Sequence, residues 1–278
     1  MRIDDGFTAR QESASERTPL SHSLFARRAG EILDLIAHLR GDLGLSEALR
    51  VVQDRYVDAE PHPELRRFAE VLGLARRQAL LQNRLDEDRE ALHSGQLAHD
   101  ERVSVGHHYE MLRQEACSYN HLLRAVIESC NQYFSRDELM SWLISASQGR
   151  SQWAKAEVTG ATSEVALHAA LQGLPELRSL RYATLEEDLA GYDFVAEWQG
   201  KLLTVDAKTG FYRPLSESKH GHRHLEISVP REATKDFRVT RRGLDLLRHE
   251  VRQTLHAEAG VQYHAPHAHY RARPAQAF

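Results

Sequence analysis

Several kinds of residue are scarce in this sequence, and each scarcity excludes a class of protein. Only two of the 278 residues are cysteine, Cys117 and Cys130, and both lie on one expected helix. At 1.5 Å per residue they would be about 20 Å apart, which is beyond the reach of a disulfide. Their spacing matches no zinc-binding motif either, so we expect both thiols to be reduced and partly buried.

Long apolar stretches are also absent. No window approaches the roughly 18 apolar residues of a membrane-spanning helix, so we expect no membrane span. Residues 1–20 are polar, carry charges of both signs and lack the apolar centre of a secretory signal. We therefore expect a disordered N-terminus and a cytoplasmic protein.

An overall excess of positive charge is missing too, because the net charge is −4. The charge is unevenly distributed, however: residues 208–252 contain 11 Lys or Arg against 6 Asp or Glu. Local charge, rather than the total, sets the field that a phosphate backbone meets. This favours a nucleic-acid contact in the C-terminal half, although a scattered, solvated surface would have the same composition.

Residues 21–150 have a helical pattern throughout and predict an all-α domain. Helices are expected over four ranges, 24–39, 46–57, 64–95 and 136–146. A fifth helix carries apolar residues at coiled-coil spacing over four heptads, namely Val105, Tyr109, Leu112, Ala116, Tyr119, Leu123, Val126, Cys130 and Tyr133. This seam over 105–133 needs a partner, either the preceding helix in an antiparallel hairpin that turns near Gly95 or a second copy of the chain. We expect the domain to serve dimerisation or regulation.

Residues 151–260 predict a smaller α/β unit, and residues 261–278 a flexible tail. The unit begins with a helix over 162–172 and ends with a helix that Thr240 caps. Strands are expected between them at 178–183, 193–198, 201–207 and 225–229. The chain as a whole is therefore expected to be an α+β protein of two domains.

The two central strands of this unit carry acidic residues at matching positions. A two-residue turn at Gln199-Gly200 would place Asp193 directly opposite Asp206, with Cβ atoms about 5 Å apart. Lys208 would project from the same face, because side chains alternate along a strand. Paired carboxylates repel unless a cation lies between them, and Mg²⁺ binds one or two carboxylates together with water and phosphate oxygens. The pattern predicts a site for phosphodiester hydrolysis, while charged hairpin ends that are merely solvated are the alternative.

The segments that contain these residues resemble a known family. Residues 186–194 and 205–210 resemble the PD-(D/E)xK superfamily of restriction-endonuclease-like nucleases, over a region of about 155–256. That family places a metal-binding Asp at the start of one strand and, a hairpin later, an apolar residue, an Asp or Glu, any residue and a Lys. The resemblance implies a restriction-endonuclease-like α/β domain with a central mixed sheet.

Carried over to this sequence, the resemblance assigns roles to five residues. It makes Asp193 and Asp206 metal ligands, with the carbonyl of Ala207 as a third. It makes Lys208 the catalytic lysine and Glu164, on the preceding helix, an accessory ligand or water-orienting group. It also implies Mg²⁺, which Mn²⁺ would replace, and DNA in preference to RNA as the substrate.

Two departures from the family pattern concern the acidic residues. Tyr192 stands where the family has a nominal Pro, and Asp206 replaces the commoner Glu, which shortens the reach of that carboxylate by about one bond. Neither departure removes a required chemical group. Asp188 and His168 are weaker candidates, for which we favour structural roles.

Basic residues after the hairpin are candidates for nucleic-acid contacts. Lys219 precedes, and Arg223 lies within, a histidine-rich segment, His220 to His224, that we read as a loop rather than a zinc site. Arg241 and Arg242 open the last helix, where exposed amide groups favour phosphate.

Taken together, these residues predict a Mg²⁺-dependent nuclease that acts on DNA, within a defence or mobile-element system. One alternative is a non-catalytic nucleic-acid-binding or assembly protein that retains a nuclease-like fold. The other is an RNase or toxin-like effector.

Overall fold

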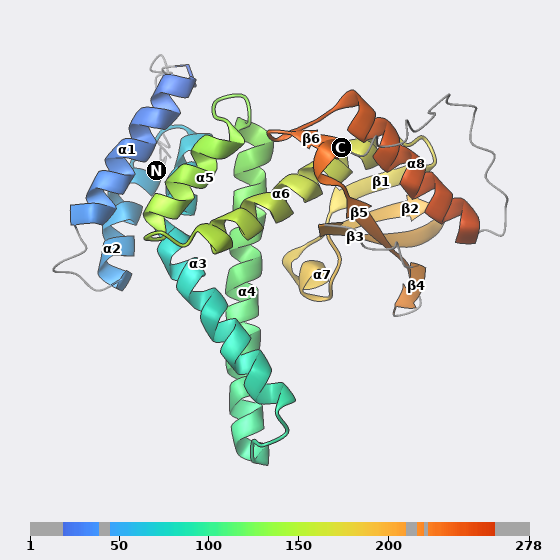
Figure 1. Ribbon diagram of the computed structural model, residues 1–278, viewed down its shortest axis with the longest axis horizontal. Coiled ribbons are helices and arrows are strands. Elements are labelled where there is room, and N and C mark those ends of the chain that lie inside the picture. Colours follow the sequence, from blue (N-terminus) through green and yellow to red (C-terminus); the bar gives the residue numbers. More distant parts are fainter. Residues whose placement is uncertain (1–18, 39–44, 210–215, 220–221, 259–278) are drawn as a thin grey trace, which may run out of the picture.

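Residues 19–38, 45–209, 216–219 and 222–258 are described in the computed structural model, and they form a helical part followed by a sheet (Figure 1). The helices of the first part are α1 (His22–His38), α2 (Leu45–Val52), α3 (Pro63–His93), α4 (His99–Cys130), α5 (Arg136–Ala146) and α6 (Ser151–Gln172). A π-helical turn over Gln53–Val57 continues α2. Pro63 begins α3, where its missing N–H costs nothing, and the Ser135 hydroxyl caps α5.

The two longest helices, α3 and α4, form an antiparallel hairpin that projects from the body of the molecule (Figure 1). Gly95 turns the chain between them with a positive φ of 70°. Residues of the heptad seam from Tyr119 to Cys130 are buried in one core with α3, and the Tyr119 hydroxyl donates to the Val71 carbonyl at 3.3 Å. Over this range the seam therefore pairs within the chain, while its N-terminal end near Val105 is only half-buried.

The second part of the chain is built on a five-stranded mixed sheet in the order β1-β2-β3-β5-β4. Its strands are β1 (Leu177–Tyr182), β2 (Phe194–Trp198), β3 (Lys201–Thr209), β4 (Ser216–Lys219) and β5 (His222–Val229). Strands β3 and β5 are parallel, and every other pair is antiparallel. The remaining elements are α7 (Leu185–Leu189), a 3-10 turn (Arg231–Ala233), the two-stranded sheet β6 (Thr234–Lys235) and β7 (Arg238–Val239), and α8 (Arg241–Glu258). The expected α+β arrangement is confirmed.

The hairpin between β2 and β3 has the predicted turn and register. Gln199 and Gly200 both have positive φ, 51° and 72°, as a tight two-residue turn requires. Pairing runs from Trp198 with Lys201 to Phe194 with Val205. The alternating apolar residues on one side of this hairpin are buried against α6 and α8.

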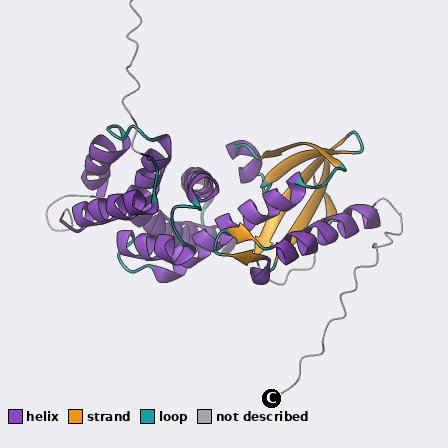
Figure 2. Ribbon diagram, turned by 90° about the horizontal axis from the view of Figure 1, so that it is seen from above, coloured by secondary structure: helices purple, strands orange, loops and turns teal. Residues whose placement is uncertain are grey.

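Two hydrophobic cores share one helix. The first includes Trp153, Ala154, Val158 and Ala161 of α6 together with helices α1 to α5. The second includes Ala166 and later residues of α6 with the sheet and α8. The change from one core to the other therefore falls inside α6, which runs between the helical part and the sheet (Figures 1 and 2).

The start of α6 differs from the expectation. The helix begins at Ser151, eleven residues before the predicted start, so Thr162 and Ser163 lie in its interior. Their hydroxyls instead donate to the carbonyls of Val158 and Thr159, four residues back, as such side chains do inside a helix. Among the described helices, none is both long and apolar enough to span a membrane.

Candidate active site

The acidic residues singled out in the sequence come from three separate segments. Glu164 lies in the middle of α6, Asp193 immediately precedes β2, and Asp206 is on β3 two residues before Lys208. The negative charges of Glu164 and Asp206 both act on Asp193. The fold thus brings three carboxylates and one ammonium group to the same end of the β2–β3 hairpin.

The pairing of β2 with β3 becomes irregular at Asp193. Its N–H donates to the carbonyl of Val205 at 2.9 Å, although Val205 is already the partner of Phe194. Two residues of one strand therefore oppose one residue of the other, as in a β-bulge. Asp193 therefore does not pair with Asp206 in regular register as expected, although the two carboxyl groups do lie within hydrogen-bonding distance of each other.

The bulge fixes the Asp193 side chain between the strands and α6. The N–H of Ala207 donates to Asp193 Oδ2 at 2.6 Å, so the carboxylate replaces a backbone acceptor where the ladder ends. Burial raises the pKa of Asp193, and the nearby charges of Glu164 and Asp206 raise it further, outweighing this backbone hydrogen bond. A carboxyl group in these surroundings is stabilised as an anion when a cation is added.

Asp206 and Lys208 form an ion pair on β3. The Asp206 residue is 8 % exposed, whereas the Lys208 side chain is partly open to solvent. Burial alone would lower the pKa of Lys208, but the hydrogen bond and charge of Asp206 outweigh it, and the pKa is raised. Lys208 is consequently held as a cation beside the carboxylates.

Arg124 of α4 was not predicted from the sequence, yet it belongs to this site. It donates to Glu164 Oε2 at 2.6 Å, and its guanidinium carbon lies 4.1 Å from the centre of the Tyr182 ring. Burial raises the pKa of Glu164 in spite of this partner. A cation from the helical part therefore neutralises one of the three carboxylates.

The donor set fits a hard divalent cation. Lys208 compensates Asp206 and Arg124 compensates Glu164, but no cationic side chain of the described residues lies within ion-pair distance of Asp193. The donors are carboxylate oxygens, which Mg²⁺ and Mn²⁺ prefer. The position of Asp193 is thus the one at which an added cation would be stabilised most.

A neighbouring group shares one of these residues. Ligand atoms of Asp206, His224 and Glu226 lie within 4.8 Å of one another, and the expected site did not include the last two. The His224 ring is buried and its Nδ1 lies 3.0 Å from the Thr204 hydroxyl. The reading of residues 220–224 as a loop is wrong from His222 onward, since β5 starts there and extends the parallel ladder to β3.

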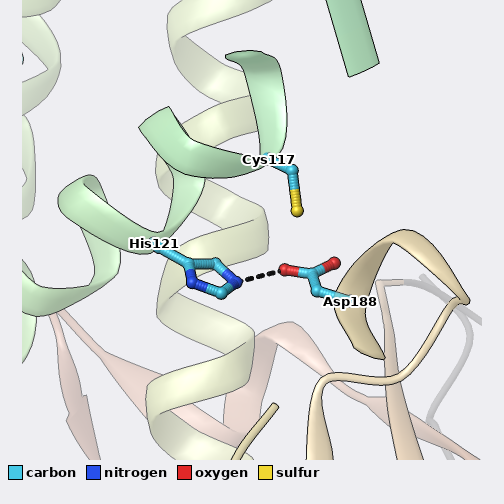
Figure 3. A group of neighbouring side chains, drawn as sticks. All are labelled: Cys117, His121 and Asp188. Carbon is cyan, nitrogen blue, oxygen red and sulfur yellow. Dashed lines mark hydrogen bonds and ion pairs between the residues drawn. The ribbon is translucent and has the colours of Figure 1, made fainter. Parts of the chain in front are cut away.

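A third group lies where α4 meets α7 (Figure 3). His121 Nε2 is 2.5 Å from Asp188 Oδ2, and the Cys117 thiol points toward the same carboxylate. Burial, together with the hydrogen bond to Asp188, raises the pKa of Cys117 to about 12. The thiol is therefore protonated, and the three residues act as a hydrogen-bonded junction. This agrees with the structural role favoured for Asp188.

The predicted nucleic-acid contacts are only partly described. Arg241 and Arg242 are exposed at the start of α8, where the Thr240 hydroxyl accepts from the N–H of Gly243 at 2.9 Å. Lys219 and Arg223 fall in β4 and β5, but their side chains lie outside the described residues. His168 is packed between rings, 4.1 Å from the centre of Tyr182, as favoured from the sequence.

Comparisons with family models, with curated proteins and with solved structures found no match for this chain. Any function must therefore be argued from the site itself.

Proposed function

We propose that this protein is a metal-dependent nuclease that hydrolyses phosphodiester bonds, with DNA as the expected substrate. The observation that carries the proposal is the gathering of Glu164, Asp193 and Asp206 around a β-bulge, with Lys208 beside them. Carboxylates from three segments repel one another, so a fold gains nothing by collecting them unless a cation is bound. The resemblance to PD-(D/E)xK nucleases supports the same reading.

The residues divide the chemistry between them. Asp193 and Asp206 would hold Mg²⁺, with the Ala207 carbonyl and Glu164 as further donors, and the ion would supply an activated water and neutralise charge on the phosphate. Lys208 is half-exposed, and its ammonium would orient the attacking water or stabilise the charge that develops on the phosphorus oxygens. Arg124 of α4 would hold the Glu164 carboxylate in place through their ion pair.

The test is a cleavage assay with Mg²⁺ or Mn²⁺ on supercoiled, linear, branched and single-stranded DNA and on RNA. The isosteric variants Asp193→Asn and Asp206→Asn, and Lys208→Gln, should each lose at least about a hundredfold in rate. Glu197→Gln is the matched control, because Glu197 lies on the same hairpin, in β2, and outside the site. A wild-type protein that is inert on every substrate, or variants as active as the control, would refute catalysis.

One observation favours a second candidate, a nucleic-acid-binding or assembly protein without catalysis. Two of the three carboxylates already have cationic partners, so the site is mostly neutralised by the chain itself. Calorimetry with Mn²⁺ separates the two functions. No binding at millimolar metal would favour this candidate, whereas binding that Asp206→Asn abolishes would favour the nuclease. The cleavage assay on RNA decides whether the protein is an RNase or toxin-like effector.

A further inference from the structure

A pocket of about 350 Å³ lies beside the candidate site, between the helical part and the carboxyl ends of β3 and β5. Its wall includes residues of both parts, among them Arg136, Lys155, Thr159, Thr209, Arg231 and Thr234. Thr209 and Val229, the last residues of the two parallel strands, are register partners at its floor. In open α/β sheets, ligands bind outside the carboxyl ends of the strands, which is where this pocket lies.

Three cations from three elements face this pocket. Arg136 is the first residue of α5, Lys155 lies in the first turns of α6, and Arg231 opens the 3-10 turn after β5. Within the described parts of the chain, no carboxylate lies within 4.0 Å of any of them, although other arginines of this protein are paired with Glu or Asp. The pocket therefore has a positive charge that the chain itself does not neutralise.

The Arg136 guanidinium has a donor that its surroundings leave unused. Its Nη2 donates to the Thr159 hydroxyl at 2.7 Å, which fixes the direction of the group. Its Nε is buried and has no hydrogen-bond partner among the described residues. The bond to Thr159 holds the Arg136 guanidinium at the wall of the pocket.

The chemistry of the wall selects a phosphate group. Arginine binds the oxygens of a phosphate through parallel N–H donors, lysine adds a point charge, and threonine hydroxyls donate to the remaining oxygens. The volume is at the lower end of ligand pockets, about 300 to 1,000 Å³, and accommodates a phosphate with part of its sugar. A carboxylate ligand would also be attracted by these cations. It has fewer oxygen atoms than a phosphate, however, and would leave some of the threonine hydroxyl groups without an acceptor.

The pocket is also close to the candidate active site along the chain. Thr209 directly follows Lys208 on β3, and Ser163, which also lines the pocket, directly precedes Glu164 on α6. Thr209 lies three residues beyond Asp206, about 10 Å at 3.3 Å per residue. A phosphate bound in the pocket would therefore belong to a nucleotide near the scissile bond.

We propose that this pocket binds a backbone phosphate of the nucleic-acid strand, close to the bond held at Asp193 and Asp206. The inference rests on the proposed function for the identity of the ligand, but binding at the pocket needs no catalysis. It assigns Arg136, Lys155 and Arg231 to the substrate path. It also makes the junction between the helical part and the sheet a part of the binding surface.

The experiment measures binding of a fluorescein-labelled oligonucleotide, single-stranded and duplex, by anisotropy in EDTA over a range of salt concentrations. Arg136→Gln, Lys155→Gln and Arg231→Gln should each weaken binding about five- to tenfold. The triple variant should also reduce the slope of log affinity against log salt by about 0.7 to 0.9, the effect of one lost phosphate contact. Arg102→Gln is the matched control, because Arg102 is exposed on α4 near the tip of the hairpin.

The outcomes separate this inference from catalysis. Pocket variants that bind the oligonucleotide as tightly as the control overturn the inference. If such variants also no longer bind inorganic phosphate, the pocket serves a small anion instead of a nucleic-acid strand. If the wild type cleaves no substrate but the pocket variants still lose oligonucleotide affinity, phosphate binding at the pocket is supported and the proposed nuclease activity is refuted. Lys155 and Arg231 are exposed, so their variants remain informative even if Arg136→Gln unfolds.

Discussion

Arg124 of α4 and Glu164 of α6 lie forty residues apart in the sequence, and their side chains meet at 2.6 Å. The Arg124 side chain is 7 % exposed and that of Glu164 is 18 % exposed, so the pair is largely removed from solvent. Because Glu164 also interacts with Asp193, this contact links the packing of the helical part to the charge balance of the candidate site.

Removal of the Arg124 side chain should destabilise the protein, and a metal ion should compensate for the loss. Arg124→Met leaves Glu164 buried beside other carboxylates, so the free energy of unfolding should fall by about 3 kcal/mol. Added Mn²⁺ should restore more of the melting temperature in this variant than in the wild type, and Glu164→Gln in the same chain should restore it without metal. An equal Mn²⁺ effect on wild type and variant would show that Glu164 is not part of a metal site.

Asp206 belongs to two groups of possible ligands, one with Asp193 and Glu164 and the other with His224 and Glu226. Substitution of the other members shows which group binds the metal ion. If the ion is held with Asp193 and Glu164, then Asp193→Asn and Glu164→Gln should each weaken Mn²⁺ binding about tenfold or more. Glu226→Gln should then change it little, although Glu226 is the register partner of Asp206 on β5. Titration calorimetry measures all three, and the reverse ranking would move the site to Asp206, His224 and Glu226.

Glu157 on α6 gives the protein a pH-dependent stability. Burial, aided by the charge of Glu164, raises the pKa of Glu157 from 4.5 to about 7. Between these values the unfolded chain releases a proton that the folded chain keeps, so this residue destabilises the fold progressively as pH rises to about 7. Glu157→Gln should therefore add about 1 to 3 kcal/mol to the free energy of unfolding at pH 8 and little at pH 5. Urea denaturation at the two pH values checks this, with Glu90→Gln as an exposed control.

The thiol of Cys117 should be inert in the folded protein. Its pKa of about 12 and its burial leave almost no thiolate at neutral pH, so alkylation should be roughly tenfold or more slower than in urea. Because Asp188 contributes to the raised pKa, Asp188→Asn in a Cys130→Ser background should speed labelling of Cys117. Mass spectrometry of the alkylated protein measures the rate. An unchanged rate in Asp188→Asn would mean that burial alone protects the thiol.

The β2–β3 hairpin could be predicted because local signals decide it. A two-residue turn fixes the register, and the alternation of apolar residues fixes the buried face. The bulge at Asp193 has no such signal, because alternation specifies which residues are buried and not where one ladder bond is exchanged for a side-chain bond. Sequence reasoning therefore brought Asp193, Asp206 and Lys208 together but missed the irregular pairing at Asp193.

The contacts between the two parts could not be predicted in the same way. Arg124 lies beside the heptad seam, where an arginine is usually a solvated flank, and its partner depends on how α4 packs against α6. The start of α6 was missed because threonine and serine suit both a cap and a helix interior that faces a backbone carbonyl. The first omission concerns tertiary packing, which a local pattern does not encode, and the second concerns a residue type that suits two local structures.

The sharing of α6 by both hydrophobic cores has a practical consequence for anyone who would split this chain. A fragment that starts at Ser151 would expose Trp153, Ala154, Val158 and Ala161 to water, while a fragment that ends at residue 150 would lose the wall that these side chains supply. Either piece would be prone to aggregate when expressed alone. Co-expressed halves should instead associate, because α6 supplies side chains to both hydrophobic cores.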